Sequence, residues 1–124
     1  MPRDIIPDVY IDSPTVTLLR DAQARIQRGW IQRYAVLPRS GVLAFCAGGA
    51  IAFDDHGRPL IGKPAQDIAR CALQLAINKL TRSQSSHISI VKFNDWYVRS
   101  QADVVQAYEV AIELRIRKEQ GLPV

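Results

Sequence analysis

Apolar residues recur at helical spacing in three long segments of the chain, and this pattern constrains the fold more than any other feature. The segments are residues 13–29, 64–82 and 101–119. A helix with one apolar face must bury that face against another element, so the chain should fold around packed helices. The apolar positions are Leu18, Leu19, Ala22 and Ile26 in the first segment, Ile68, Ala69, Ala72, Leu73, Ala76, Ile77 and Leu80 in the second, and Val104, Val105, Tyr108, Ala111, Ile112 and Ile116 in the third.

Residues with special backbone preferences mark the ends of these helices. Ser13 is a good N-cap for the first helix, and Gly29 is a natural stop at its end. Pro64 suits the first position of the second helix. Ser100 and Asp103 resemble a capping box, with Asp in place of the more usual Glu, so the third helix should begin at residue 101.

The sequence between the first two helices indicates a hairpin followed by a short helix. Residues 30–45 alternate in polarity around a turn signal at 38–41, which predicts a β-hairpin with a turn of three to five residues. Residues 46–53, CAGGAIAF, are small and apolar, and we expect a short buried helix. Its paired glycines make sense if another backbone or a ligand approaches closely. Residues 54–57 form a clear turn.

Length and composition allow one domain. The chain has 124 residues, of which 48% are hydrophobic and 23% are charged, as in an ordinary globular protein. A short helix capped by Ser86 is expected near residues 88–93, before Asn94 and Asp95 interrupt the pattern. We therefore predict a helix-rich α+β fold with about four helices and one short β-hairpin. Residues 1–12 should form an extended N-terminal arm, and residues 13–124 a single globular domain.

Charge and cysteine content point to a cytoplasmic protein with no metal. The net charge of +4 favours anionic partners but falls short of the basic stripe of a duplex-DNA binder. Cys46 and Cys71 belong to no CxxC pair, so we expect two buried free thiols and no zinc site. We expect no signal sequence, because residues 1–10 contain no apolar signal region, and no segment has the roughly 20 apolar residues needed to span a bilayer.

Motifs for catalysis are weak throughout. The two histidines, His56 and His87, lie in loop-like sequence, and neither a GxSxG motif nor a phosphate-binding glycine pattern occurs. Asp54 and Asp55 are adjacent acids in a turn, where carboxylates are usually solvated. We therefore expect no enzyme activity and no cofactor, with a nucleotide-acting enzyme as a minor alternative.

Two motifs are candidates for ligand binding. Trp30 and Arg33 could stack on a base and hold a phosphate, although Trp30 could equally plug the end of the first helix. Asn94 could read a base or ribose edge and Asp95 could accept from hydroxyls, whereas such side chains in turns commonly bond their own backbone.

A third candidate is the cationic end of the last helix. Arg115, Arg117 and Lys118 would suit an anion, yet cations at a helix C-terminus are favourable without any ligand. Arg115 and Arg117 lie about 200° apart around a helix, so both face one small ligand only if the helix end frays or two subunits contribute.

Taken together, these motifs resemble a domain family of unknown function found in phages and bacteria. The resemblance rests on four segments in a fixed order: Arg28-Gly29-Trp30, Cys46-Ala47-Gly48-Gly49-Ala50-Ile51, Phe93-Asn94-Asp95, and Asp103-Val104 leading to Ala111-Ile112. The pattern is also similar to the first type of phage Thoeris anti-defence proteins. Gly48 and Trp96 depart from it, since relatives often carry a larger apolar residue and a small or polar residue at these positions.

The second resemblance implies a function. Thoeris anti-defence proteins of this type are sponges that sequester cyclic ADP-ribose signals, and in some members cyclic oligonucleotides, without cleaving them. They assemble as dimers and higher oligomers. By this resemblance Trp30 would stack on adenine, Asn94 and Asp95 would contact ribose or base, and Arg115 would meet a phosphate. The alternative is a small nucleic-acid- or protein-binding module that uses the basic C-terminal helix.

Overall fold

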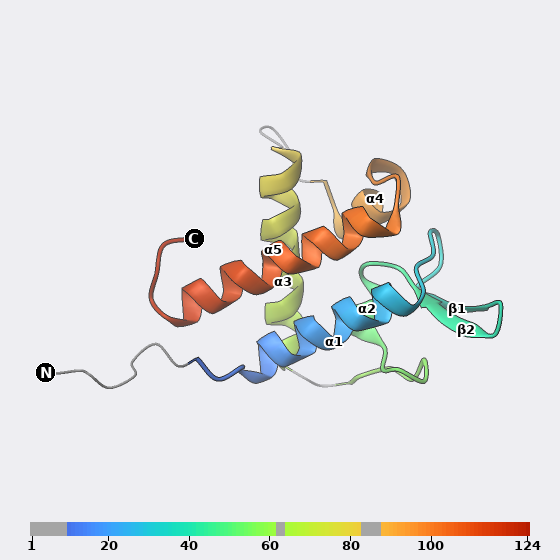
Figure 1. Ribbon diagram of the computed structural model, residues 1–124, viewed down its shortest axis with the longest axis horizontal. Coiled ribbons are helices and arrows are strands. Elements are labelled where there is room, and N and C mark those ends of the chain that lie inside the picture. Colours follow the sequence, from blue (N-terminus) through green and yellow to red (C-terminus); the bar gives the residue numbers. More distant parts are fainter. Residues whose placement is uncertain (1–9, 62–63, 83–87) are drawn as a thin grey trace, which may run out of the picture.

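Three long helices and one β-hairpin dominate the structure, a computed structural model that describes residues 10–61, 64–82 and 88–124 (Figure 1). The helix-rich α+β fold is confirmed, with five α-helices in these residues instead of about four. No helix in the described ranges is long and apolar enough to cross a membrane. In chain order the elements are α1 (Pro14–Arg28), β1 (Val36–Arg39), β2 (Val42–Phe45), α2 (Gly49–Ala52), α3 (Pro64–Thr81), α4 (Ile90–Lys92), the π-helix η1 (Phe93–Tyr97) and α5 (Gln101–Glu119).

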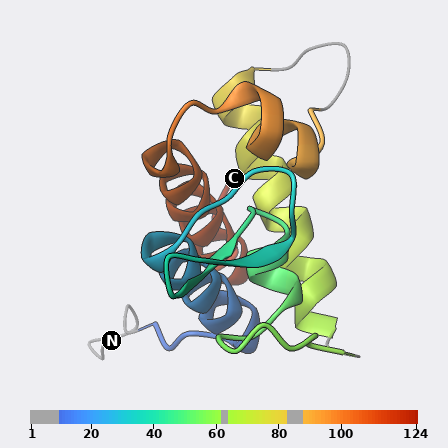
Figure 2. The same cartoon turned by 90° about the vertical axis from the view of Figure 1, so that its right-hand side faces the viewer.

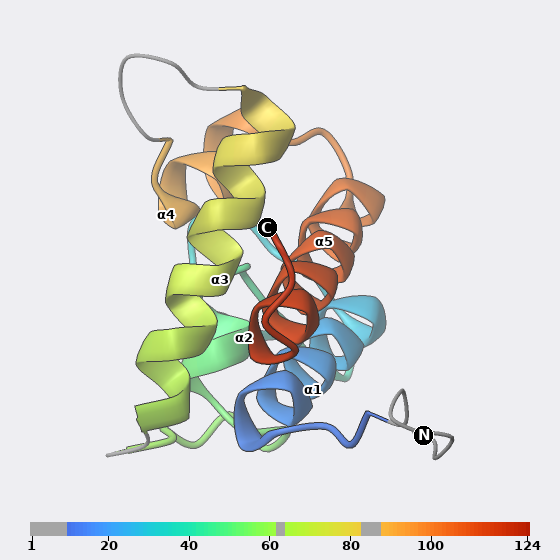
Figure 3. The ribbon, with the colours of Figure 1, turned by 90° about the vertical axis from the view of Figure 1, so that its left-hand side faces the viewer.

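The core lies between α1, α3 and α5. Helices α1 and α5 run side by side in opposite directions, and α3 crosses them steeply (Figures 1 and 3). The apolar faces expected from the sequence meet here, because each helix can bury its stripe only against the other two. Fully buried positions of the three helices include Val16, Leu19, Ala22, Ile26, Leu73, Ala76, Ile77, Val104, Ala107, Tyr108 and Ala111.

Both ends of α1 follow the sequence prediction, though for different reasons. The Ser13 hydroxyl accepts a hydrogen bond from the Val16 amide at 3.2 Å, as an N-cap should. The helix stops before Gly29, but this residue is extended rather than left-handed. A Cβ at Gly29 would lie 2.6 Å from the Leu43 carbonyl oxygen. Gly29 is therefore needed for close approach of the hairpin.

The hairpin is shorter and tighter than expected. Strands β1 and β2 pair in antiparallel register from Val36 opposite Phe45 to Arg39 opposite Val42. The turn contains two residues, Ser40 and Gly41, with φ of 54° and 80°, so the expected three- to five-residue turn is wrong. Residues 30–35 do not extend the strand, and the Gln32 side chain and the Arg33 amide bond to η1 instead. The hairpin packs on the end of α1 (Figure 2).

Helix α2 is the short buried helix expected in residues 46–53. Its first residue, Gly49, is fully packed, and a Cβ there would lie 2.0 Å from the Ala35 carbonyl oxygen. Gly48 has no such constraint, since a Cβ would meet only the Ile90 side chain at 3.6 Å. One glycine of the pair therefore permits close backbone approach, and the other does not. Cys46 before α2 is half-buried, whereas Cys71 on α3 is exposed, which corrects the expectation of two buried thiols.

The segment around the Phe-Asn-Asp motif is helical rather than interrupted. Helix α4 is capped by Ser89, whose hydroxyl accepts from the Lys92 amide at 3.1 Å. The Ser86 cap expected from the sequence lies outside the described residues. The chain then continues into η1 without a break, so Asn94 and Asp95 lie inside a π-helical turn. Single π-turns of this kind occur frequently at functional sites.

The last helix begins and ends where the sequence indicates. Ser100 is the N-cap by position, but the capping box does not form, because Asp103 accepts from the Arg99 amide at 3.0 Å instead. At the other end, Glu119 accepts from the hydroxyls of Tyr10 and Ser13, both at 2.7 Å. The end of the N-terminal arm is thus fixed to α5, and residues 1–9 lie outside the described ranges.

The glycine pair before Ala50 provides a matched test of this packing. We expect Gly49→Ala to lower the free energy of unfolding by about 3 kcal/mol or more, because the new methyl group cannot fit against a backbone carbonyl. Gly48→Ala, one residue away, should cost less than about 1 kcal/mol. Urea unfolding of the two variants measures this difference. Equal losses in both variants would show that the Ala35 contact is not as close as described.

Candidate functional site

Asn94 lies at the centre of the segments that carry the sequence motifs. Its side chain is fully buried, and its Oδ1 accepts from the Trp30 indole Nε1 at 2.8 Å and from the Ala47 amide at 2.9 Å. Its Nδ2 donates to the Ile31 carbonyl at 3.1 Å and to Asp95 Oδ1 at 2.9 Å. These four bonds use the full capacity of a carboxamide. A ligand could contact Asn94 only by replacing one of them, so we assign it to positioning Trp30.

Asp95 and Arg33 fix the loop that follows α1. The Arg33 amide donates to Asp95 Oδ1 at 2.8 Å, and Gln32 Nε2 donates to the Asn94 carbonyl at 2.9 Å. Arg33 has a φ of 75°, a conformation that a non-glycine residue keeps only when its surroundings impose it. Its guanidinium lies over the Trp96 ring, 5.3 Å from the ring centroid. The side chains of Asp95 and Arg33 are therefore already engaged within the protein.

A hollow of about 330 Å³ opens beside Trp30, between the end of α1, the hairpin and the start of α5. We call it the Trp30 hollow; it is lined by Trp30, Arg28, Arg39, Ser40 and Gln101, among others. The bond to Asn94 fixes the orientation of the half-buried Trp30 indole. Gln101 is held in place because its Nε2 donates to the Gln27 carbonyl at 3.1 Å. The hollow thus combines one immobilised aromatic ring with two cationic side chains.

The two arginines of the Trp30 hollow differ in their existing partners. Arg28 Nη2 lies 2.8 Å from Asp55 Oδ1, and the same oxygen accepts from Arg25 Nε at 2.8 Å. The hydrogen bond from Arg25, together with the charges of Arg25 and Arg28, lowers the pKa of Asp55 below its ordinary value. The Arg39 side chain makes no hydrogen bond or ion pair within the described part of the chain. Arg39 is therefore the cation most available to an incoming anion.

The cationic end of α5 lies far from this hollow. Arg115 follows Gln101 by fourteen residues, which is about 21 Å along the helix axis. Arg115 Nε is paired with Glu119 at 2.8 Å, and Arg117 Nε donates to the Pro123 carbonyl at 2.8 Å. The hollow beside Arg115 measures only about 100 Å³. Within one chain, Arg115 and Arg117 lie too far from Trp30 to share one small ligand with it, so a combined site would need a second subunit.

The most exposed aromatic residue of the region was not among the sequence candidates. Trp96 is 73% exposed, and Tyr97 beside it is 50% exposed. Trp96 was noted only as a departure from the family pattern, and nothing in the local sequence reveals that Arg33 covers one of its faces. Arg39 was also missed, because only the hairpin register brings it near Trp30. Among the described residues, no three His, Cys, Asp or Glu side chains gather as a metal site would require.

Removing the Asn94 carboxamide tests whether its hydrogen bonds hold these segments together. We expect Asn94→Ala to lower the free energy of unfolding by about 3 kcal/mol, because the Trp30 and Ala47 N–H groups lose their acceptor. The melting temperature should fall by about 10 °C. Gln106→Ala, at an exposed position on α5, is the matched control and should change the melting temperature little. A stable Asn94→Ala variant would mean that these N–H groups find other partners.

Comparison with known proteins gives a match to one family of unknown function. Residues 11–114 match a family described as a family of unknown function, DUF6197. No curated protein and no solved structure matches the chain. The match covers α1 to most of α5, and it includes Trp30, Asn94 and all residues of the Trp30 hollow. The chain therefore belongs to the DUF6197 family.

Proposed function

We propose that this protein binds a phosphate-bearing, nucleotide-like molecule in the Trp30 hollow and holds it without cleaving it. The observation that carries the proposal is that Trp30, fixed by its bond to Asn94, lines the same hollow as Arg28 and Arg39. An aromatic ring can stack on a base, and such stacking contributes about 1–3 kcal/mol per base in nucleic-acid-binding proteins. A guanidinium can bind phosphate oxygens through two parallel hydrogen bonds.

The electrostatics of the hollow suit an anion with more than one charge. Arg39 can bind a phosphate directly, because it has no partner among the described residues. Arg28 can turn from Asp55 to a second phosphate without leaving that carboxylate unpaired, since Arg25 still donates to it. The side-chain carbonyl oxygen of Gln101 adds an acceptor for a ribose hydroxyl or a base amino group. A diphosphate between two ribose or base groups satisfies all of these partners.

In its finer form, the proposal is that the ligand is a cyclic nucleotide immune signal, such as a cyclic ADP-ribose isomer. Support for this step comes from the resemblance to phage anti-defence sponges, which would act in the cytoplasm of the infected cell. The Trp30 hollow is open on one side, and a second copy of the chain could enclose the ligand more fully. A homo-oligomer is therefore part of the proposal. The basic C-terminal helix supports nucleic-acid binding less well, because its two arginines are engaged within the chain.

A ligand panel tests the proposal directly. We expect one member of a set of cyclic ADP-ribose isomers and cyclic di- and trinucleotides to raise the melting temperature by several degrees. A ligand present at 100 times its dissociation constant stabilises the folded state by about 2.7 kcal/mol. Chromatography after heat denaturation should return the ligand unchanged. Recovery of a cleaved product would instead identify an enzyme.

Paired arginine variants locate the binding site. Arg39→Ala should weaken binding about tenfold, because it removes a charge-assisted bond to phosphate. Arg70→Ala, an exposed arginine on α3 outside the hollow, should bind as the unaltered protein does. Equal affinity of both variants would place the site elsewhere. Salt-dependent binding of oligonucleotides, with no response to any cyclic nucleotide, would contradict the proposal in favour of a nucleic-acid-binding module.

A further inference from the structure

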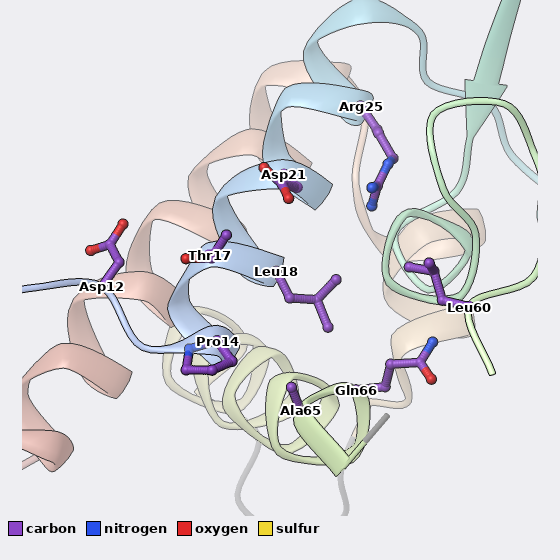
Figure 4. A pocket seen from close by; sticks show the side chains of 9 residues that line it. All are labelled: Asp12, Pro14, Thr17, Leu18, Asp21, Arg25, Leu60, Ala65 and Gln66. Atoms are coloured by element: carbon purple, nitrogen blue, oxygen red, sulfur yellow. The ribbon is translucent and has the colours of Figure 1, made fainter. Parts of the chain in front are cut away.

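A second, larger hollow lies at the opposite end of α1 from Trp30. It measures about 430 Å³, which is within the usual size range of small-molecule sites. We call it the α1–α3 hollow, because α1 and the start of α3 form two of its sides and the loop before α3 forms the third (Figure 4). Its apolar wall consists of Pro14, Leu18, Leu60 and Ala65.

One end of the α1–α3 hollow is formed by a buried guanidinium. The Arg25 side chain is only 6% exposed and extends from α1 toward Leu60 (Figure 4). Its Nε donates to Asp55 at 2.8 Å and its Nη1 to the Ala50 carbonyl at 2.7 Å. Nη2 makes no hydrogen bond with any described residue, yet no described buried polar atom lacks a partner. Nη2 is therefore not completely buried, and Arg25 is one of the residues that line the hollow.

A carboxylate of opposite charge lines the same hollow without pairing with Arg25. Asp21 lies one turn earlier on α1, at the spacing that normally favours an ion pair along a helix. The two side chains form no ion pair, because Arg25 is turned toward α2 and Asp55. Asp21 has no other partner among the described residues, whereas Asp12 at the rim is already paired with Arg20 at 2.7 Å. The Arg25 guanidinium and the Asp21 carboxylate thus lie apart from each other along the same apolar wall.

From this arrangement we propose that the α1–α3 hollow binds a small zwitterion with an apolar body, of the size of an apolar dipeptide. Its carboxylate would accept from Arg25 Nη2, its ammonium group would donate to Asp21, and its side chains would pack on Leu18 and Leu60. A nucleotide fits poorly here, because Asp12 and Asp21 would repel its phosphates. The site is therefore distinct from the Trp30 hollow, and it does not depend on the function proposed there.

Titration of the dipeptide leucyl-leucine into the full chain, followed by two-dimensional NMR, tests this proposal. We expect saturable shifts centred on Leu18, Leu60 and Ala65. The carboxyl-amidated dipeptide should bind about tenfold more weakly, because it loses a charge-assisted bond to a buried guanidinium. The amino-acetylated dipeptide should bind about threefold more weakly, since Asp21 is exposed.

The variant Asp21→Asn separates recognition from mere apolar contact. This residue makes no contact that the fold needs, so the variant should remain folded. It should bind leucyl-leucine about threefold more weakly and should no longer distinguish it from the acetylated form. Glu113→Gln, an exposed acid on α5, is the matched control and should behave as the unaltered protein does. Absence of shifts at millimolar dipeptide, or undiminished discrimination in Asp21→Asn, would overturn the proposal.

Discussion

The buried carboxamide of Asn94 joins three segments that share no regular secondary structure. These segments are the loop after α1, the turn before α2 and the π-helical turn η1. The Ala47 amide and the Ile31 carbonyl have no backbone partner among the described residues, so the Asn94 side chain satisfies them. The hydroxyl of the buried Tyr108 adds a bond to the Ala47 carbonyl from α5, and burial raises the pKa of this phenol well above its ordinary value. Both backbone polar groups of Ala47, its N–H and its C=O, are thereby hydrogen-bonded.

This arrangement separates the residues that hold the site from the residues that are available to a ligand. The motif residues Gly29, Gly49 and Asn94 permit close backbone approach or satisfy buried groups. The groups left for binding lie around them, on the hairpin and at the start of α5. Asp55 links the two hollows, because it accepts from Arg25 in one and from Arg28 in the other. A ligand that draws Arg28 away would leave Asp55 to Arg25 alone.

Local patterns predicted the fold well, but they did not predict how the segments around Trp30 pack together. The helix at 64–81 and the cap at Ser13 depend on apolar spacing and on bonds between near neighbours, which the sequence displays directly. The loop at 30–35 depends on bonds to residues 62 positions away, and the alternating pattern there suggested a strand instead. The rise of a helix already indicates that Arg115 lies far from the start of α5. The position of Trp30 relative to Arg115 depends on how the helices pack, which local sequence patterns do not reveal.

Hydrogen exchange of the two tryptophan indole N–H groups, followed by NMR, tests the role of Asn94 most directly. The indole of Trp30 donates to Asn94, whereas Trp96 is 73% exposed and its indole N–H has no acceptor among the described residues. The Trp30 proton should exchange at least about fivefold more slowly than the Trp96 proton, since breaking a buried hydrogen bond costs about 1 kcal/mol or more. Equally fast exchange of both protons would contradict a fixed Trp30 and, with it, the preformed hollow.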